Sequence, residues 1–182
     1  MEEKKTVQTE VEKPRDRAVL AGLSSPRLDK RDNADEDTLE ELGALVETAG
    51  GEGAAVVLQN RAAPEPRTFI GEGKVAEIRE LVRNEEATMV IFDNDLSPSQ
   101  MRVLTQELGV QVLDRSGLIL DIFAQRARTR EGRLQVELAQ YQYLLPRLTG
   151  MWTHLGRRAG PGGTGPWGAK GPGGPRRGPA GG

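Results

Sequence analysis

The sequence of 182 residues contains no cysteine and only one histidine. The absence of cysteine excludes disulfides and thiolate metal sites and is consistent with a reducing compartment. The single histidine, His154, excludes a histidine metal cluster, and we expect it to be a polar residue on a helix face. No apolar run approaches the ~20 residues that a membrane span requires, and residues 1–16 lack the apolar centre of a secretory signal. We therefore expect a cytoplasmic protein with no membrane span.

Basic residues are outnumbered in the first part of the chain, and acidic residues are scarce in the rest. Residues 1–114 carry 14 basic and 24 acidic side chains, whereas residues 115–158 carry 8 basic and 3 acidic ones. Residues 159–182 add 3 basic side chains and no acidic one. This asymmetry indicates that the C-terminal half faces a polyanion, although a solvated helix surface explains a modest excess of charge about as often.

Segments typical of strands and of helices alternate between residues 18 and 114. Short apolar runs at 18–23, 54–58, 88–92 and 110–113 predict four buried strands. Helices are predicted to begin near Thr38, Gly71 and Ser97, the last with a serine cap and a proline at its first position. The alternation predicts an α/β domain over residues 18–114, with a small parallel sheet and helices on both faces. Residues 1–17 are predicted to be a disordered extension.

Beyond residue 114 the sequence predicts a long amphipathic helical arm at residues 115–158. Its apolar residues are spaced by four, three, four and three positions, as in a coiled-coil seam, at Leu134, Leu138, Tyr141, Leu145 and Leu148. The seam could fold back on the domain, but the length of the pattern favours a straight arm that forms the first half of a helical hairpin and leaves a seam open to self-association. Pro146 is expected to kink or end the helix. Residues 159–182 are rich in glycine, proline and arginine and are predicted to be a disordered tail.

Two segments of the α/β domain contain residues suited to phosphate or metal binding. Residues 71–74, Gly-Glu-Gly-Lys, offer free N–H groups and an ammonium, but Val75 stands where a phosphate loop needs a hydroxyl. A simple helix N-terminus is therefore the favoured interpretation. Asp93 and Asp95 follow a predicted parallel strand, where paired carboxylates can hold magnesium. For these two residues an Asx-type turn before the Ser97 cap is favoured over a metal site.

Arginines gather along the predicted arm and are the candidates for contact with RNA, because the planar guanidinium donates two hydrogen bonds to phosphate in one geometry. The candidates are Arg126, Arg128, Arg130, Arg133, Arg147, Arg157 and Arg158. As an alternative, Arg115 and Arg126 form salt bridges with Asp114 and Asp121 and fix the joint between the domain and the arm. We assign no catalytic, cofactor-binding or metal-binding residue to this chain.

Several segments occur together and in the same order as in one known family. They are FIGEGK at 69–74, FD at 92–93, LSPSQ at 96–100, the stretch 114–140, YLLPRL at 143–148 and MWTHL at 151–155. This set resembles the HflX-type ribosome-associated GTPases over residues 18–158. The resemblance implies an N-terminal α/β domain, a two-helix arm and a following magnesium-dependent GTP-binding domain. It also implies association with the large (50S) ribosomal subunit and its RNA in translation, ribosome rescue or biogenesis.

The G-x-x-x-x-G-K-[ST] phosphate loop of that following domain is absent from this sequence. We therefore expect this chain to bind neither GTP nor Mg²⁺ and to be inactive as an enzyme, although both cofactors are implied for the full-length family. Residues 161–182 depart from the family's arm tip, and a frameshift in G+C-rich DNA or a truncated gene is the favoured explanation. The alternative function is a small magnesium-dependent nucleotide-binding or phosphoryl-receiving enzyme that uses Asp93 and Asp95.

Overall fold

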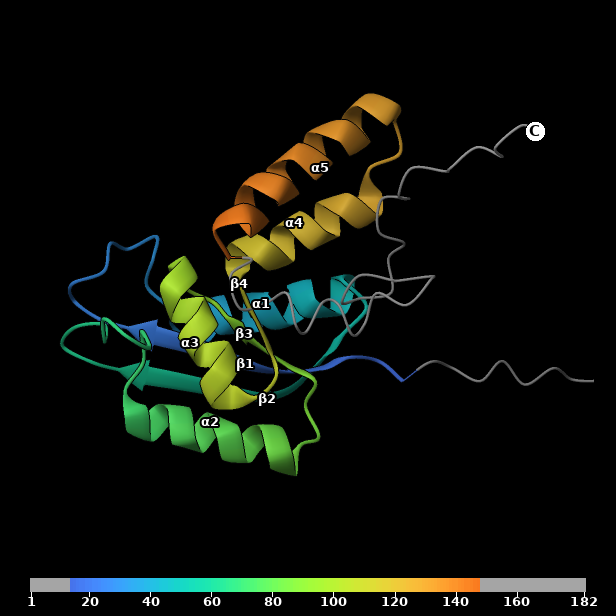
Figure 1. The fold of residues 1–182 in the computed structure, drawn as a ribbon. Helices are drawn as coiled ribbons and strands as arrows, with labels where there is room; N and C mark the ends of the chain where they lie inside the picture. The colour runs from blue at the N-terminus through green and yellow to red at the C-terminus, as the bar shows by residue number, and fades with distance from the viewer. Residues whose placement is uncertain (1–13, 148–182) are drawn as a thin grey trace, which may run out of the picture.

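The computed structural model describes residues 14–147, in which four strands alternate with helices (Figure 1). In chain order the elements are β1 Arg17–Ser24, α1 Glu36–Thr48, β2 Glu52–Asn60, α2 Glu72–Asn84, β3 Met89–Phe92, α3 Pro98–Leu108, β4 Gln111–Asp114, α4 Arg115–Arg126, α5 Arg130–Leu144 and a short 3-10 helix η1 Leu145–Arg147. All four predicted strands and the three predicted helices of the α/β domain are confirmed. Residues 1–13 of the predicted extension and the whole predicted tail lie outside the described residues, as do His154, Arg157 and Arg158.

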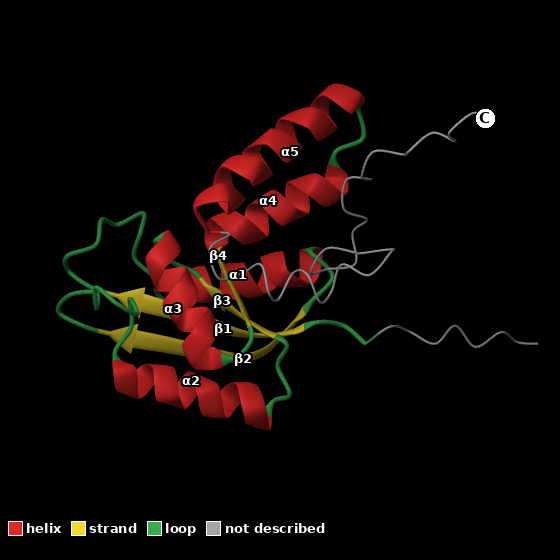
Figure 2. Ribbon diagram, in the orientation of Figure 1, coloured by secondary structure: helices red, strands yellow, loops and turns green. Residues whose placement is uncertain are grey.

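The four strands form one parallel sheet in the order β2-β1-β3-β4. Helices α1 and α4 cover one face of this sheet, and α2 and α3 cover the other (Figure 2). The predicted α/β class, with a parallel sheet between two layers of helices, is confirmed. No helix among residues 14–147 is long and apolar enough to cross a bilayer.

Alternation along β1 creates the two hydrophobic cores. Ala18 and Leu20 face the core beneath α1 and α4, while Val19, Ala21 and Leu23 face the core beneath α2 and α3. All five residues are essentially inaccessible to solvent. Burial of one leucine side chain contributes about 1.5–3 kcal/mol. The sheet and its two cores therefore form a rigid base that positions the carboxyl ends of the strands and the arm.

Helix caps explain where the domain helices begin. Asp35 and Ser97 each form a capping box, in which the cap side chain accepts from the third residue of the helix and that residue's side chain contacts the cap in return. Pro98 is the first residue of α3, as the Ser97-Pro98 pair predicts. Gly109 ends α3 with φ of 71°, a left-handed conformation that favours glycine.

Over residues 115–147 the predicted helical arm is confirmed, but it is broken into two antiparallel helices rather than straight, and residues 148–158 of the prediction lie outside the described residues. α4 ends at Arg126, and after residues 127–129 α5 returns beside it (Figure 1). Thr129 starts α5 because its hydroxyl accepts a hydrogen bond from the Gly132 N–H at 3.0 Å. A Cβ at Gly132 would lie 2.8 Å from that hydroxyl, so a larger residue there would require the Thr129 side chain to shift. Pro146 lies in η1 just past the end of α5, as predicted.

Helix α4 packs on the sheet. Its Leu118 and Ile122 belong to the core beneath α1, together with Leu113 of β4. The boundary between domain and arm at residue 115 remains a prediction, because a domain boundary separates segments that fold independently of each other. Within the described residues, α4 is part of the sandwich and α5 projects beside it.

Candidate nucleic-acid interface

Four of the predicted RNA-contact arginines gather at the outer end of the α4–α5 hairpin. Arg126 is the last residue of α4, Arg128 lies in the turn, and Arg130 and Arg133 lie in the first turn of α5. All four side chains are exposed. The C-terminus of α4 and the N-terminus of α5 meet at this end with opposite helix dipoles, so its positive potential comes from the arginine side chains. We call these four residues the arginine tip.

The arginine tip is not neutralised by acidic groups of the described chain. None of the salt bridges among residues 14–147 involves Arg126, Arg128, Arg130 or Arg133. The only hydrogen bond that the four arginine side chains form within those residues runs from Arg133 Nε to the Ala127 carbonyl, at 3.3 Å. Guanidinium forks therefore point into solvent, where phosphate oxygens can accept from them.

Arg147, also predicted to contact RNA, lies at the opposite end of α5 and contacts the protein. Its guanidinium stacks on the Tyr143 ring at 3.9 Å from the centroid. Nη1 donates to the Tyr143 carbonyl at 2.7 Å, and Nη2 donates to the Leu96 carbonyl at 3.3 Å. Its Nε is buried and has no partner within the described residues. Arg147 is therefore a structural contact of the hairpin base in this conformation.

Sequence reasoning missed the residue that anchors α5, which is Tyr143. Its hydroxyl donates to Asp114 Oδ1 at 2.6 Å. Asp114 is fully buried and also accepts from the Gly117 N–H at 3.0 Å and the Leu96 N–H at 3.1 Å. Burial, followed by the negative charge of Asp114, raises the pKa of Tyr143 far above its ordinary value, so the phenol remains a donor. A tyrosine in an amphipathic helix carries no local signal of such a contact.

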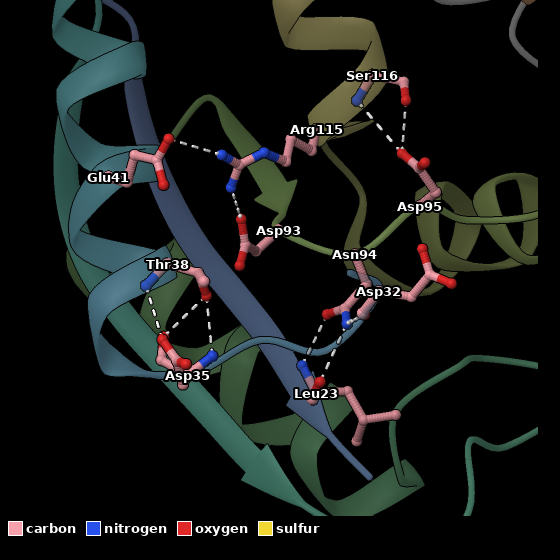
Figure 3. Close-up of polar contacts among 10 residues, drawn as sticks. All are labelled: Leu23, Asp32, Asp35, Thr38, Glu41, Asp93, Asn94, Asp95, Arg115 and Ser116. Atoms are coloured by element: carbon pink, nitrogen blue, oxygen red, sulfur yellow. Dashed lines mark hydrogen bonds and ion pairs between the residues drawn. The ribbon is translucent and has the colours of Figure 1, made fainter. Parts of the chain in front are cut away.

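Arg115 and Asp121 take partners other than the predicted ones. Arg115 Nη1 donates to Asp93 Oδ1 at 2.6 Å, and Nη2 lies 3.1 Å from Glu41 Oε1 (Figure 3). Burial on its own would lower the pKa of Arg115, but the carboxylates of Asp93 and Glu41 outweigh it and raise that pKa. The predicted salt bridges with Asp114 and Asp121 do not form within residues 14–147. Arg115 instead connects the start of α4 to Asp93, which follows β3, and to Glu41 of α1.

The partner of Asp121 is Gln125, whose Nε2 lies 3.1 Å from Asp121 Oδ2. Burial raises the pKa of Asp121 to about 6, and the hydrogen bond from Gln125 opposes that rise. Gln125 also donates to the Ala49 carbonyl at 3.2 Å, which ties α4 to the end of α1. A buried acid with a raised pKa therefore lies between α4 and α1.

Asp93 and Asp95, the alternative magnesium site predicted from the sequence, both accept hydrogen bonds from the first residues of α4. Asp93 is held by Arg115, and Asp95 Oδ1 accepts from the Ser116 hydroxyl at 2.7 Å and from the Ser116 N–H at 3.3 Å (Figure 3). Within residues 14–147 no three or more His, Cys, Asp or Glu side chains come together as a set of metal ligands. A guanidinium already neutralises Asp93, so the donor set does not fit a divalent cation.

The crevice where doubly wound sheets place ligands is filled by a side chain. The strand order reverses between β1 and β3, which makes their carboxyl ends the expected position. There the buried Asn94 accepts from the Leu23 N–H at 2.8 Å and donates to the carbonyls of Leu23 at 3.0 Å and Asp32 at 2.6 Å (Figure 3). An open hollow of about 320 Å³ lies to one side, lined by Ser24, Ala34, Asp35, Glu36, Asp37, Leu58 and Asn60. Asp35 is occupied there in capping α1 through Thr38.

The glycine-lysine segment forms the start of α2, as favoured from the sequence. Gly71 is the residue before the helix, and its N–H donates to Gln59 Oε1 at 2.9 Å. Lys74 Nζ pairs with Glu77 Oε2 at 2.7 Å on the same helix. A Cβ at Gly71 would lie 2.6 Å from Arg61 Nη1, so the glycine serves local packing. These contacts leave the lysine directed along its own helix.

Two consecutive family regions match the chain. Residues 36–124 match the family described as "GTP-binding GTPase N-terminal", and residues 126–176 match "GTP-binding GTPase Middle Region". The first covers most of the α/β sandwich, and the second begins at the arginine tip and runs into the glycine-rich segment. The fold and its arm thus define the front regions of a GTP-binding protein.

Individual relatives agree with this class. GTPase HflX of Escherichia coli (strain K12) is 52% identical over 126 residues, which cover 69% of this chain and 30% of that protein. GTPase HflX of Alkalihalophilus pseudofirmus is 46% identical over 142 residues, which cover 78% of this chain and 33% of that protein. A crystal structure of a GTP-binding protein from the archaeon Sulfolobus solfataricus in complex with GDP has a TM-score of 0.56 at 29% identity, covering 76% of this chain and 40% of that one.

The chain belongs to the HflX-type GTPase family. It spans about a third of the length of the curated relatives that it matches. The resemblance predicted from the ordered segments is confirmed.

Proposed function

We propose that this chain is the ribosome-binding front part of an HflX-like GTP-binding protein, one that associates with the large (50S) ribosomal subunit in the cytoplasm during translation, ribosome rescue or biogenesis. The observation that carries the proposal is the arginine tip: four exposed arginines at the outer end of a two-helix hairpin, with no carboxylate partner among the described residues. Arg157 and Arg158 are proposed as further contacts and lie outside the described residues.

The chemistry of the tip suits ribosomal RNA. Each guanidinium donates a planar pair of hydrogen bonds that matches a phosphate, and each phosphate contact releases condensed counterions. The helical hairpin carries the tip away from the acidic α/β domain, which keeps the domain's carboxylates from repelling the RNA. Affinity of this kind falls steeply as salt rises, which provides a direct signature.

A co-sedimentation titration tests this proposal. Purified chain is pelleted with 50S subunits at increasing KCl, and the triple variant Arg126→Gln, Arg128→Gln, Arg130→Gln is compared with the wild type. Arg27→Gln, Lys30→Gln, Arg31→Gln is the matched control, because it removes the same charge from exposed positions far from the tip. We expect the tip variant to bind at least tenfold more weakly and to reduce the slope of log affinity against log salt by about three, one for each contact removed. Equal losses in both variants would refute a specific role for the tip.

Nucleotide chemistry is proposed for the full-length family protein and not for this chain. When bound elsewhere in such a protein, GTP and Mg²⁺ supply phosphoryl transfer, whereas the residues described here supply attachment. The alternative, a magnesium-dependent enzyme using Asp93 and Asp95, predicts heat on mixing with Mg²⁺ and ATP or GTP that Asp93→Asn abolishes. Because Arg115 and Ser116 occupy these carboxylates, we expect isothermal titration calorimetry to show no heat.

Self-association through the arm is a secondary part of the proposal. Leu134 and Leu138 on α5 and Leu145 of η1 are 57%, 59% and 63% exposed, and they follow the predicted seam. Such a row of exposed leucines pairs readily with another helix. Sedimentation velocity at increasing concentration should therefore show dimers, which Leu138→Glu reduces.

A further inference from the structure

The base of the hairpin packs against both faces of the sheet at its β4 edge. α4 packs on the core beneath α1, whereas Tyr143 of α5 packs against the opposite core, which α2 and α3 cover. The Tyr143 hydroxyl also lies 3.9 Å from Met101 Sδ of α3. The hairpin therefore straddles β4, and Tyr143 is the side chain of α5 that reaches across.

A missing side chain creates the place that Tyr143 occupies. A Cβ at Gly117 would lie 2.6 Å from the Tyr143 hydroxyl oxygen and 3.0 Å from its Cζ. A methyl group at residue 117 would therefore push the ring out of reach of Asp114. Gly117 is also the third residue of α4, whose N–H donates to Asp114. Gly117 therefore has two roles: its N–H completes the cap of α4, and its missing side chain leaves room for the Tyr143 ring.

The seat joins three segments through one buried carboxylate. Asp114 accepts from Gly117 at the start of α4, from Leu96 before α3 and from Tyr143 near the end of α5. Arg147 closes the outer side by stacking on the Tyr143 ring. Arg102 of α3 donates to the Pro146 carbonyl at 3.2 Å, which secures the next turn of chain. A hydrogen bond to a buried charged acceptor is among the stronger single contacts in a protein.

We propose that the Tyr143–Asp114 contact, seated on Gly117, is a latch that holds α5 beside α4, and that Tyr143 is a positioning residue for RNA contact by Arg130 and Arg133, the two arginines of the tip that α5 carries. This inference rests on the proposed function. Helix α4 is held by its buried face, so a released α5 pivots about residues 127–129. Helix α5 has 15 residues and is about 22 Å long, so a swing of about 20° displaces its Tyr143 end by about 8 Å and turns Arg130 and Arg133 relative to Arg126. The arginines of the tip then no longer hold one arrangement, so a released α5 must be ordered again on binding.

The test uses two variants that release the latch by different means. Tyr143→Phe removes the hydroxyl and keeps the ring, and Gly117→Ala fills the seat. Tyr141→Phe is the matched control, since it removes an exposed hydroxyl from the same helix that makes no hydrogen bond to residues 14–147. The chain has no cysteine, so dyes on the exposed positions Glu80→Cys and Gln142→Cys report the distance between the domain and the Tyr143 end of α5 without background labelling. Circular dichroism checks that each variant is folded.

We expect Tyr143→Phe and Gly117→Ala to broaden the dye distance distribution and to weaken 50S binding about tenfold, the ratio that one hydrogen bond to a charged group sustains. The slope of affinity against salt should stay at the wild-type value, because the phosphate contacts are the same. Combining the two variants should add little, because both remove one contact.

The outcomes separate the latch from the proposed function. If the wild type fails to bind 50S subunits, the proposed function is wrong, and the dye distances still decide whether the latch exists. If the wild type binds and both variants match it in distance distribution and affinity, the latch is refuted. A broadened distance with unchanged affinity refutes the positioning role. If Tyr143→Phe does not fold, Gly117→Ala and its distance distribution decide the question alone.

Discussion

Helices α4 and α5 are neighbours of similar length, yet only one of them belongs to the core. α4 buries Gly117, Leu118, Asp121 and Ile122, whereas no residue of α5 is buried. The order of α4 comes from apolar burial against α1 and the sheet. The order of α5 comes from polar contacts at its two ends: the Thr129 cap and the Tyr143–Asp114 contact. Amphipathic sequence alone therefore does not reveal whether a helix is held by its face or by its ends.

The largest expected effect comes from the face of α4. Leu118 is fully buried, so Leu118→Ala leaves a cavity and should lower the free energy of unfolding by about 2–5 kcal/mol. Leu138→Ala, the same change on α5, should stay within about 0.5 kcal/mol of the wild type, because that side chain is already exposed. Urea unfolding of both variants checks the comparison. Equal losses would mean that α5 is packed in solution.

The next effect depends on pH and also lies on α4. The pKa of Asp121 in the folded chain, about 6, lies above its ordinary value of 3.8. Its contribution to stability is therefore complete below about pH 3.8 and is lost as pH rises through about 6. Asp121→Asn keeps an oxygen for Gln125 and carries no charge, so it should raise the stability at pH 7 by about 1–2 kcal/mol and flatten the profile between pH 4 and 7. Thermal melts across that range measure it, and a wild type that gains stability from pH 4 to 7 through this residue would contradict the sign.

A smaller effect is expected at the outer end of α5. Thr129→Ala removes the cap and should cost about 1 kcal/mol, confined to the first turn of the helix. Hydrogen exchange at residues 130–133 should rise, while exchange in α4 stays at the wild-type level. Thr48→Ala serves as a control because that hydroxyl bonds to the Ala44 carbonyl within α1. A global rise in exchange would show that the tip turn supports the whole hairpin.

The smallest expected effect is a difference between the two ends of α5 in how substitutions change the salt dependence of 50S binding. Arg128→Gln should weaken 50S binding a few-fold and reduce the salt slope by about one, because it removes a proposed phosphate contact. Arg147→Gln should also weaken binding a few-fold, through loss of the Tyr143 stack, with no change in slope. If Arg147→Gln also reduced the slope of log affinity against log salt, Arg147 would be an RNA contact after all.

The sequence was sufficient for the α/β domain because its signals are local. Apolar runs, the Ser97-Pro98 pair and Gly109 each determine structure within a few residues, and each element appears where they indicate. The resemblance in segment order also led to the correct family. The placement of four arginines beside one another follows from the broken arm, although their role stays a prediction.

What the sequence did not reveal are contacts between distant segments. Asn94 meets Leu23 across 71 positions, and Tyr143 meets Asp114 across 29 positions. No spacing rule encodes either contact. The straight arm was wrong because the heptad-like pattern begins at Leu134, so it carries no information about the break at residues 127–129. Thr129 with Gly132 three residues later was a readable signal for the break, and Asp114 with Gly117 repeats it at the start of α4.

Asn94 has a consequence for how this domain can change over generations. Its amide fills the crevice that related architectures leave open for cofactors, and it ties the first strand to the loop beside it. A small molecule could occupy the space between the ends of β1 and β3 only if that tie were lost, and the loss would remove three hydrogen bonds from Leu23 and Asp32. Substitutions that create new binding properties are therefore expected to cost less stability on the exposed face of α5 than at these strand ends.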